Sequence, residues 1–289
     1  MKLHLKTLLL GVLCAASISA ASIGIRAADT PLDPSAYRIL EDGVNVTVDG
    51  WAYDGEVYKV NNTAYVGLRE FACYADNSIV SWDEASLTAR VSTDSLQLTA
   101  VENRRSLDAN GRILWCELGI FRIDDALYVP LRQIAQAFGF EAFYDGAENR
   151  TYLTRHRGAI ESADTYYDEE ELYWLSRIIH AESQGEPFLG KLAVGNVILN
   201  RVDAAQFPDT IYGVIFDRKN GVQFTPTANG AIYQTPGDES VMAAKICLED
   251  TRLSEDILYF LNRRLASSFW IVENCRFVMD IGGHSFYAP

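Results

Sequence analysis

One acidic side chain occupies a position where an apolar residue is expected. Leu172, Leu175 and Ile179 recur at intervals of three and four, a spacing that predicts an amphipathic helix. Glu182 is the next position on that stripe, so its carboxyl group should lie on the buried side, in the last helical turn. Partial burial and the negative end of the helix dipole both raise a carboxyl pKa. A glutamate with a pKa near ~6 can act as a general acid at neutral pH.

Periodicity alone leaves structural alternatives open for this carboxyl group. The helix could end early and leave Glu182 solvated, or the carboxylate could pair with Arg177 or Arg201. The signals at the two helix ends place Glu182 in the last helical turn. Asp168 is a good N-cap, and Gly185 is expected at the C-cap.

Other elements must position this helix. A second helix is expected over 187–202 and a third over 238–250. The aromatic and β-branched segments 257–262 and 269–287 predict strands and turns. The C-terminal part is therefore expected to be helix-rich with a small β element.

An internal repeat organises the N-terminal part. AYVGLREFA at 64–72 recurs as LYVPLRQIA at 127–135. Each unit is expected to form a strand, a short helix and a strand. The alternating segments 45–50 and 96–101 predict further strands. The fold class expected for the whole chain is therefore α+β, with a β-rich module of two repeats before the helix-rich domain.

The second half resembles the spore cortex-lytic family of cell wall hydrolases. Five colinear blocks carry the resemblance: LSRIIHAESQGEPFLGKLAVGNVILNRV (175–202), VIFDRKNGVQFTPTANGAIY (214–233), ILYFLN (257–262), ASSFWIV (266–272) and IGGHSFY (281–287). The resemblance implies a lysozyme-like fold and cleavage of the glycan strands of peptidoglycan. The family's catalytic acid corresponds to Glu182. Ala181-Glu182-Ser183 is also similar to the Glu-Ser of soluble lytic transglycosylases.

Aromatic and amide side chains in these blocks could bind sugars. The substrate-binding residues that we predict are Gln223, Phe224, Asn229, Tyr259, Asn262, His284 and Tyr287, with Tyr233 and Trp270 as further candidates. For each aromatic residue, packing in the core is the alternative. Asn196 and Asn200 could face a groove, or cap a helix, or be solvated. His284 follows Gly282-Gly283, where the family usually has Gly-Asn, which puts any contact of that asparagine in doubt.

The sequence offers no clear second carboxylate. Glu186 is expected to cap the following helix. A single acid suits lytic transglycosylation of the β-1,4 bond between muramic acid and glucosamine, whereas glycosidases that use water generally need two carboxylates. Hydrolysis by a muramidase is the alternative if Glu186, Asp209 or Asp280 approaches the site. A wall-binding or scaffold protein without catalysis is a further alternative.

The N-terminal repeat resembles the stalk-like N-terminal domain of copper amine oxidases, over about residues 38–155. The resemblance implies an accessory module. It implies no copper site, because His156, His180 and His284 all lie outside the repeat. Residues 156–167 are expected to form a linker, and residues 168–289 the catalytic domain.

Composition and charge exclude other classes of function. The 289 residues carry a net charge of −14, which argues against nucleic acid and anionic membranes as partners. Residues 1–21 resemble a secretory signal peptide, with Lys2 and Lys6 before the apolar run 8–18. A secreted protein associated with the cell wall or the spore is therefore expected, with no membrane contact after cleavage.

No cofactor or metal is expected. A zinc amidase would need about three ligands, usually including several histidines, and a cysteine peptidase would have to use Cys275 with His284. Four cysteines remain after signal cleavage, namely Cys73, Cys116, Cys247 and Cys275, and their even number permits two disulfides. The oligomeric state is left open.

Overall fold

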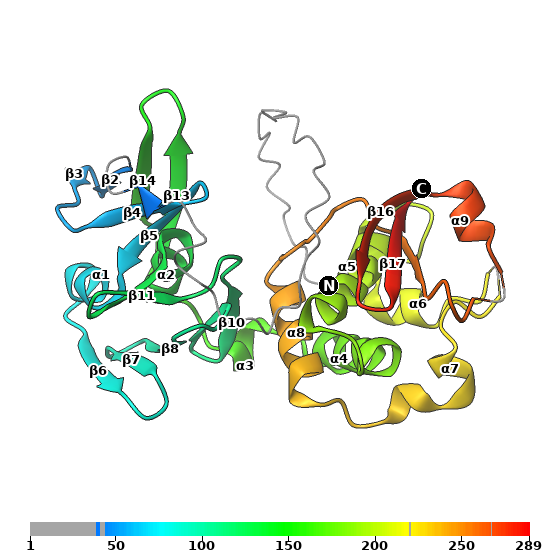
Figure 1. Cartoon of the computed structure of the whole chain (residues 1–289). Helices are drawn as coiled ribbons and strands as arrows, with labels where there is room; N and C mark the ends of the chain where they lie inside the picture. Colours follow the sequence, from blue (N-terminus) through cyan, green and yellow to red (C-terminus); the bar gives the residue numbers. More distant parts are fainter. Residues whose placement is uncertain (1–38, 41–43, 220, 267) are drawn as a thin grey trace.

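The computed structural model describes residues 39–40, 44–219, 221–266 and 268–289. The expected signal peptide lies outside the described residues. A β-rich N-terminal half and a helix-rich C-terminal half lie side by side (Figure 1), which confirms the expected α+β class. Among the described residues we find no helix with the length and hydropathy that a bilayer crossing requires.

Three sheets form the N-terminal half. The first has the order β1-β4-β5-β12-β11, the second β10-β9-β8-β7-β6, and the third β13-β14-β2-β3. Their strands are β1 (Ile39–Leu40), β2 (Asn45–Val48), β3 (Trp51–Ala52), β4 (Val57–Val60), β5 (Thr63–Gly67), β6 (Ile79–Asp83), β7 (Thr88–Ser92), β8 (Gln97–Val101), β9 (Ser106–Ala109), β10 (Arg112–Trp115), β11 (Phe121–Ile123), β12 (Ala126–Pro130), β13 (Phe140–Asp145) and β14 (Arg150–Arg155).

The two repeats meet at their equivalent strands. Each repeat forms a strand, a helix and a strand as expected, with α1 (Leu68–Ala75) after β5 and α2 (Leu131–Ala137) after β12. Strands β5 and β12 pair antiparallel, and Val66 lies opposite its own counterpart Val129. The repeat therefore pairs with its own copy about a local pseudo-twofold axis, and both valines are fully buried.

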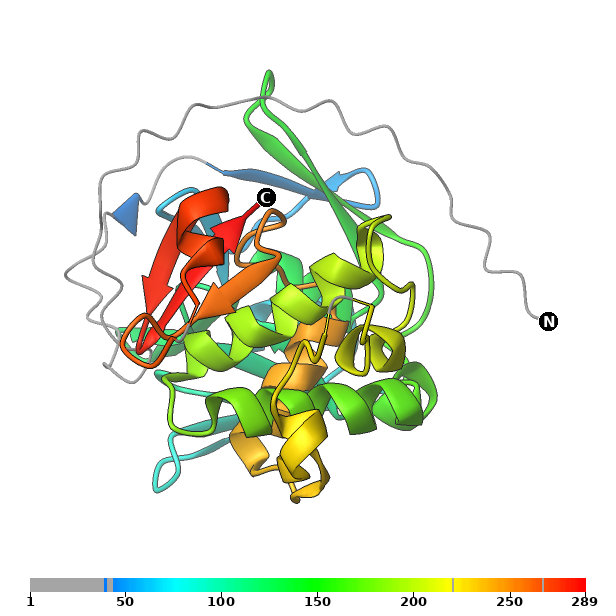
Figure 2. The ribbon, with the colours of Figure 1, turned by 90° about the vertical axis from the view of Figure 1, so that its right-hand side faces the viewer.

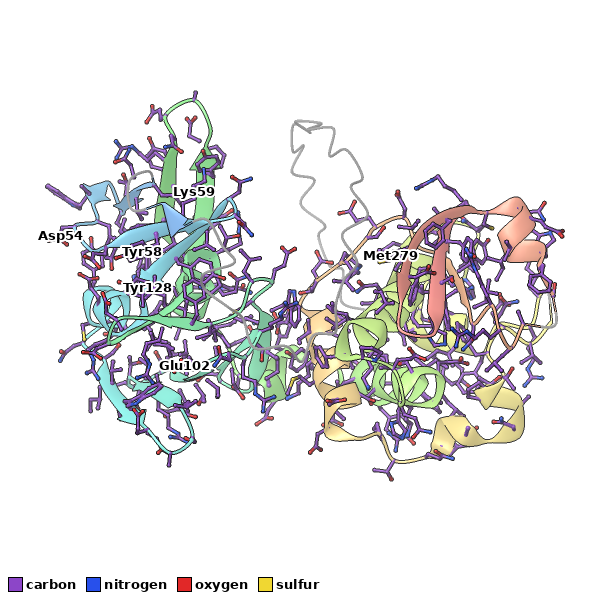
Figure 3. The ribbon with its side chains drawn as sticks, in the orientation of Figure 1. Asp54, Tyr58, Lys59, Glu102, Tyr128 and Met279 are labelled. Atoms are coloured by element: carbon purple, nitrogen blue, oxygen red, sulfur yellow. The ribbon has the colours of Figure 1, made fainter. Side chains whose placement is uncertain are left out.

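A small aromatic cluster lies on the first sheet, which contains β4, β5 and β12. Tyr58 of β4 and Tyr128 of β12 pack edge to face with ring centroids 4.9 Å apart (Figure 3). Tyr128 donates a hydrogen bond of 2.9 Å to Glu56.

Helices dominate the C-terminal half (Figure 2). They are α4 (Glu169–Ser183), α5 (Phe188–Asp203), α6 (Ile211–Ile215), α7 (Pro226–Asn229), the 3-10 helix η2 (Ala231–Tyr233), α8 (Asp238–Leu248) and α9 (Trp270–Asn274). Strands β15 (Tyr259–Leu261), β17 (His284–Ala288) and β16 (Arg276–Ile281) form one antiparallel sheet in that order. Helix α5 is buried along almost its whole length, which makes it the centre of this half.

Two sequence expectations differ from the structure. Residues 270–274 were expected to be extended, because they are aromatic and β-branched, yet they form the one-and-a-half turns of α9. Asn274 Nδ2 donates back to the Trp270 carbonyl and helps to close this helix. Helix α4 ends with Gln184 at its C-cap, one residue before Gly185, which was expected there.

A buried ion pair joins the two halves. Arg112 of β10 donates to both carboxylate oxygens of Glu249 at the end of α8, at 2.8 and 2.6 Å, and both side chains are only 3% exposed. Tyr167 donates a third hydrogen bond to Glu249, at 2.7 Å, while the Arg112 guanidinium stacks on the Tyr166 ring. The contact lies where β10, α3 (Ala163–Tyr166) and α8 meet in Figure 1.

Residues 156–167 therefore contribute to this contact through α3 and the two tyrosines. Trp115 stacks on Phe188 beside it, and Lys245 donates to the Gly111 carbonyl at 3.0 Å. The polar, aperiodic segment that we expected to be a linker is packed against both halves.

Glu249→Gln should destabilise the protein by about 3 kcal/mol, because it leaves the buried Arg112 guanidinium without a counter-ion. The free energy of unfolding from urea titration measures this loss. Glu255→Gln, at an exposed position in the same half, is the control and should change stability by less than about 0.5 kcal/mol. Equal stability of the two variants would contradict the role that we assign to the ion pair.

Candidate active site

Helix α4 places the Glu182 carboxyl group at the edge of the C-terminal core. Asp168 caps the helix by accepting hydrogen bonds from the backbone of Glu170 and Glu171, as expected. Leu175 and Ile179 are fully buried, so the predicted stripe faces the core. Glu182 continues that stripe in the last turn and is half-buried.

Burial raises the pKa of Glu182 to about 7. No hydrogen bond or ion pair to its carboxyl group occurs within the described residues, so nothing offsets the loss of water around the charged form. The alternative of a pair with Arg177 or Arg201 is therefore not what the structure shows. The side chain is poised to carry a proton near neutral pH.

A cavity of about 1080 Å³ opens beside Glu182. It is formed by the ends of α4 and α5, residues 206–207, 219 and 223–225, strand β15 with residues after it, α9 and the start of β17. A space of this size can take several sugar rings, since drug-sized ligands occupy ~300–1,000 Å³.

Most of the predicted site residues line this cavity. Besides Glu182 these are Gln223, Phe224, Tyr259, Asn262 and His284, and the further candidate Trp270 lines it too. They come from segments up to a hundred residues apart, which the fold brings together around one space.

Two predicted substrate-binding residues lie elsewhere. Asn229 ends α7, and its side chain accepts a hydrogen bond from Ala231 N, so it stabilises a turn outside the cavity lining. Tyr287 is 1% exposed, and its hydroxyl accepts from Arg263 Nε at 2.8 Å. Neither side chain lines the cavity, because local hydrogen bonding and core packing hold each of them elsewhere.

The two asparagines of α5 have a purely structural position. Asn196 exchanges hydrogen bonds with the backbone of Thr251 and Leu253, and Asn200 donates to the carbonyls of Ser254 and Ile257. Both are buried. These hydrogen bonds hold the segment before β15 against α5. The spacing of the two asparagines within the helix does not indicate such a role.

Glu186 has a position that the sequence did not predict. It was expected to cap α5, but that helix begins after Pro187 with no side-chain cap. Glu186 instead lines the cavity and accepts a hydrogen bond of 2.7 Å from Gly283 N, in the turn between β16 and β17. A second carboxylate therefore does stand beside the cavity.

The glycines of that turn make this contact possible. Gly282 has a φ of +59°, and a Cβ built there would clash with Glu186 Oε2. A Cβ at Gly283 would lie 2.9 Å from Glu186 Oε1 and 3.1 Å from the Asn262 amide. Gly283 stands where the resembled family usually has asparagine, and its missing side chain leaves the space that the Glu186 carboxylate fills.

Asp209 and Asp280, the other carboxylates considered for hydrolysis, do not line the cavity. Asp280 accepts a hydrogen bond from Ser285 across the β16–β17 turn. His284 is 8% exposed and packs on Phe260. Burial lowers its pKa, while the nearby Glu186 acts in the opposite direction.

Sequence reasoning missed two cations of the lining, Arg201 and Lys219. Arg201 was considered only as a partner of Glu182. Its burial at the end of α5 could have been inferred from the apolar residues around it, but its place at the cavity could not.

The four cysteines Cys73, Cys116, Cys247 and Cys275 carry free thiols, so the two disulfides that their number permitted are absent from the described residues.

Glu182→Gln should change the pH dependence of stability. The wild-type carboxyl ionises near pH ~4.5 when unfolded but only near 7 when folded, so wild-type stability falls as pH rises through this window. The glutamine side chain does not titrate. The free energy of unfolding of the variant should therefore exceed that of the wild type by on the order of 2 kcal/mol at about pH 8. Thermal unfolding at about pH 4 and pH 8 measures the difference. An advantage that is the same at both pH values would show that the carboxyl group is well solvated.

Both halves of the chain are similar to known protein families. Residues 185–287 match the family described as Cell Wall Hydrolase, and residues 46–153 match the Copper amine oxidase N-terminal domain. The first match begins three residues after Glu182. A spore cortex-lytic enzyme of Bacillus cereus is 37% identical over 120 residues, which cover 42% of this chain and 45% of that protein.

Further relatives match a similar share of this chain. A spore cortex-lytic enzyme of Bacillus subtilis is 32% identical over 42% of this chain and 38% of its own length. The solved catalytic domain of the germination-specific lytic transglycosylase SleB from Bacillus anthracis is 34% identical, with a TM-score of 0.39 over 43% of this chain and 98% of that one. The chain thus spans less than half the length of these curated relatives. Residues 185–287 of this chain belong to the cell wall hydrolase family, and residues 46–153 are similar to the Copper amine oxidase N-terminal domain.

Proposed function

We propose that the protein is a secreted peptidoglycan glycosidase whose residues 168–289 cleave the β-1,4 bond between muramic acid and glucosamine. One observation carries the proposal, namely a carboxyl group with a raised pKa and no protein partner on the wall of a cavity that is large enough for a glycan strand. The similarity to spore cortex-lytic enzymes supports the same substrate.

Glu182 acts first as the general acid. Its neutral carboxyl group donates the proton to the glycosidic oxygen O4 of glucosamine while the bond from that oxygen to C1 of muramic acid breaks. The sugar ring at C1 develops the positive charge of an oxocarbenium ion. The carboxylate that remains on Glu182 then carries a negative charge beside it, which stabilises that state.

The same carboxylate acts next as the base. It accepts the proton of the C6 hydroxyl of the muramic acid residue, and the O6 oxygen forms a bond to C1. The product is a 1,6-anhydro sugar, and no water is consumed. The nucleophile belongs to the sugar itself, so its proximity lowers the barrier.

Hydrolysis is the second candidate, and the position of Glu186 favours it. Glu186 lines the same cavity as Glu182 and is held to the β16–β17 turn. A carboxylate in this place could accept a proton from a water molecule that attacks C1. Muramidase action would then give reducing ends in place of anhydro ends.

Residues 38–155 serve in this proposal as an accessory module, joined to the catalytic domain by residues 156–167. The buried pair of Arg112 and Glu249 supports a fixed orientation of the module relative to the catalytic cavity. Such a module would hold the enzyme at its polymeric substrate in the cell wall or the spore.

Digestion of purified peptidoglycan by the full protein tests the proposal. Mass spectrometry of the fragments should show anhydro-muramic ends, whereas fragments heavier by one water would support hydrolysis. Protein that binds both vegetative wall and spore cortex but releases no fragments from either would favour the scaffold alternative.

Glu182→Gln should lower the rate of cleavage by about 10²–10⁴-fold, because the amide cannot transfer a proton. The release of soluble fragments from labelled peptidoglycan measures the rate. Glu171→Gln, at the first turn of the same helix and outside the cavity lining, is the matched control and should retain full activity. Wild-type rates in the Glu182→Gln variant would remove Glu182 from the mechanism.

The pH profile should follow the same group. The acid is active when protonated, so kcat/KM should fall about tenfold per pH unit above the raised pKa of about 7. A profile that stays flat to about pH 9 would mean that another group supplies the proton.

A further inference from the structure

Arg201 carries a buried charge that makes no ion pair among the described residues, and the Asp217 carboxylate acts on it only from beyond ion-pair distance. It lies near the end of α5, is 6% exposed and lines the cavity. Its Nε donates to the Leu258 carbonyl at 2.8 Å, which anchors the guanidinium group. Its Nη1 is buried and has no hydrogen-bond partner. No carboxylate forms an ion pair with it among the described residues.

The other buried cations of the described chain differ from Arg201 in this respect. Arg112 is paired with Glu249 at 2.6 Å. Lys191 is paired with Glu239 at 3.1 Å and also donates to the Glu186 carbonyl. An isolated buried charge is costly. With a net charge of −14, this protein has abundant acidic residues that could have neutralised Arg201. Arg201 is left without an ion pair on the wall of a cavity that a ligand can enter.

Aromatic rings hold the guanidinium in place. Its carbon lies 4.8 Å from the ring centroid of Phe207, 5.2 Å from that of Phe224 and 5.5 Å from that of Tyr259. All three rings also line the cavity. Cation–π contacts stabilise the charge in part, but the face of an aromatic ring offers no oxygen to accept the hydrogen bonds of the guanidinium edge.

We infer that Arg201 is a substrate-binding residue whose guanidinium group donates hydrogen bonds to an acyl oxygen carried by the bound sugar. A planar guanidinium is suited to carbonyl and carboxylate oxygens. Amino sugars carry such an oxygen on the N-acetyl group, and muramic acid carries another on its lactyl group. The second cation of the lining, Lys219, favours the same kind of ligand. The inference rests on the proposed function, since it takes the cavity occupant to be a glycan.

Binding experiments in the full-length Glu182→Gln protein separate the two sources of the oxygen without turnover. The probes are tri-N-acetylchitotriose, which has only N-acetyl groups, and a peptide-free tetrasaccharide of alternating N-acetylglucosamine and N-acetylmuramic acid. Calorimetry gives the Kd of each probe before and after Arg201→Lys. The matched control is Arg177→Lys, because Arg177 also has a buried unpartnered nitrogen and stacks on a tyrosine, but lies outside the cavity lining.

Arg201→Lys should raise Kd about tenfold, or ~1.4 kcal/mol. A loss for both probes identifies the N-acetyl oxygen, and a loss for the muramic acid probe alone identifies the lactyl oxygen. If Arg201→Lys weakens neither probe more than Arg177→Lys does, the inference is overturned while the proposed function stands. If the Glu182→Gln protein binds neither probe, the proposed function fails as well.

A measurement on protein with Arg201 intact covers the case in which Arg201→Lys does not fold. Arginine side-chain NMR of the Glu182→Gln protein should show the Arg201 Nη protons shifting downfield and exchanging more slowly with water when a probe is added. Unchanged Arg201 signals at saturating probe would contradict the inference, whatever the behaviour of the variant.

Discussion

The site depends on one carboxyl group that is kept from water without being given a partner. A carboxylate that loses its hydration must gain hydrogen bonds or a cation, or else bind a proton. Glu182 has neither compensation within the described protein, so protonation is the only response left to it. The cost of this arrangement is stability at high pH, and the gain is a proton held at the wall of a cavity.

Arg201 presents the same constraint with the opposite sign. Its guanidinium group remains charged at neutral pH even though burial lowers its pKa to about 10. The cavity thus holds a half-buried acid that keeps its proton up to about pH 7 and a buried cation that makes no ion pair among the described residues. Both are incomplete in the same space, which is the pattern expected where a ligand supplies the missing contacts.

Hydrogen bonds and an ion pair between neighbouring elements hold the cavity wall in place, although Glu182 and Arg201 lack partners there. Asn196 and Asn200 fasten the chain before β15 to the central helix, and the Gly282-Gly283 turn is fastened to Glu186. On the far side of the C-terminal half, the pair of Arg112 and Glu249 ties α8 to the repeat module. Of the four buried side-chain nitrogen and oxygen atoms without a partner among the described residues, those of Arg201 and His284 belong to side chains that line the cavity.

The sequence by itself determined the local features. Helical periodicity is a property of neighbouring residues, so it predicted α4, its Asp168 cap and the inward position of Glu182. The internal repeat likewise predicted the strand–helix–strand units. The resemblance to a known family placed most of the cavity-lining residues in its blocks, although Asn229 and Tyr287 in those blocks turned out to serve a turn and the core.

Only the tertiary structure decided which distant groups meet. Glu186 and Gly283 are 97 residues apart, and Arg112 and Glu249 are 137 apart. No spacing in the sequence encodes such contacts, because they follow from how whole elements pack. For the same reason, the absence of an ion pair at Arg201 could be recognised only once its neighbours were known.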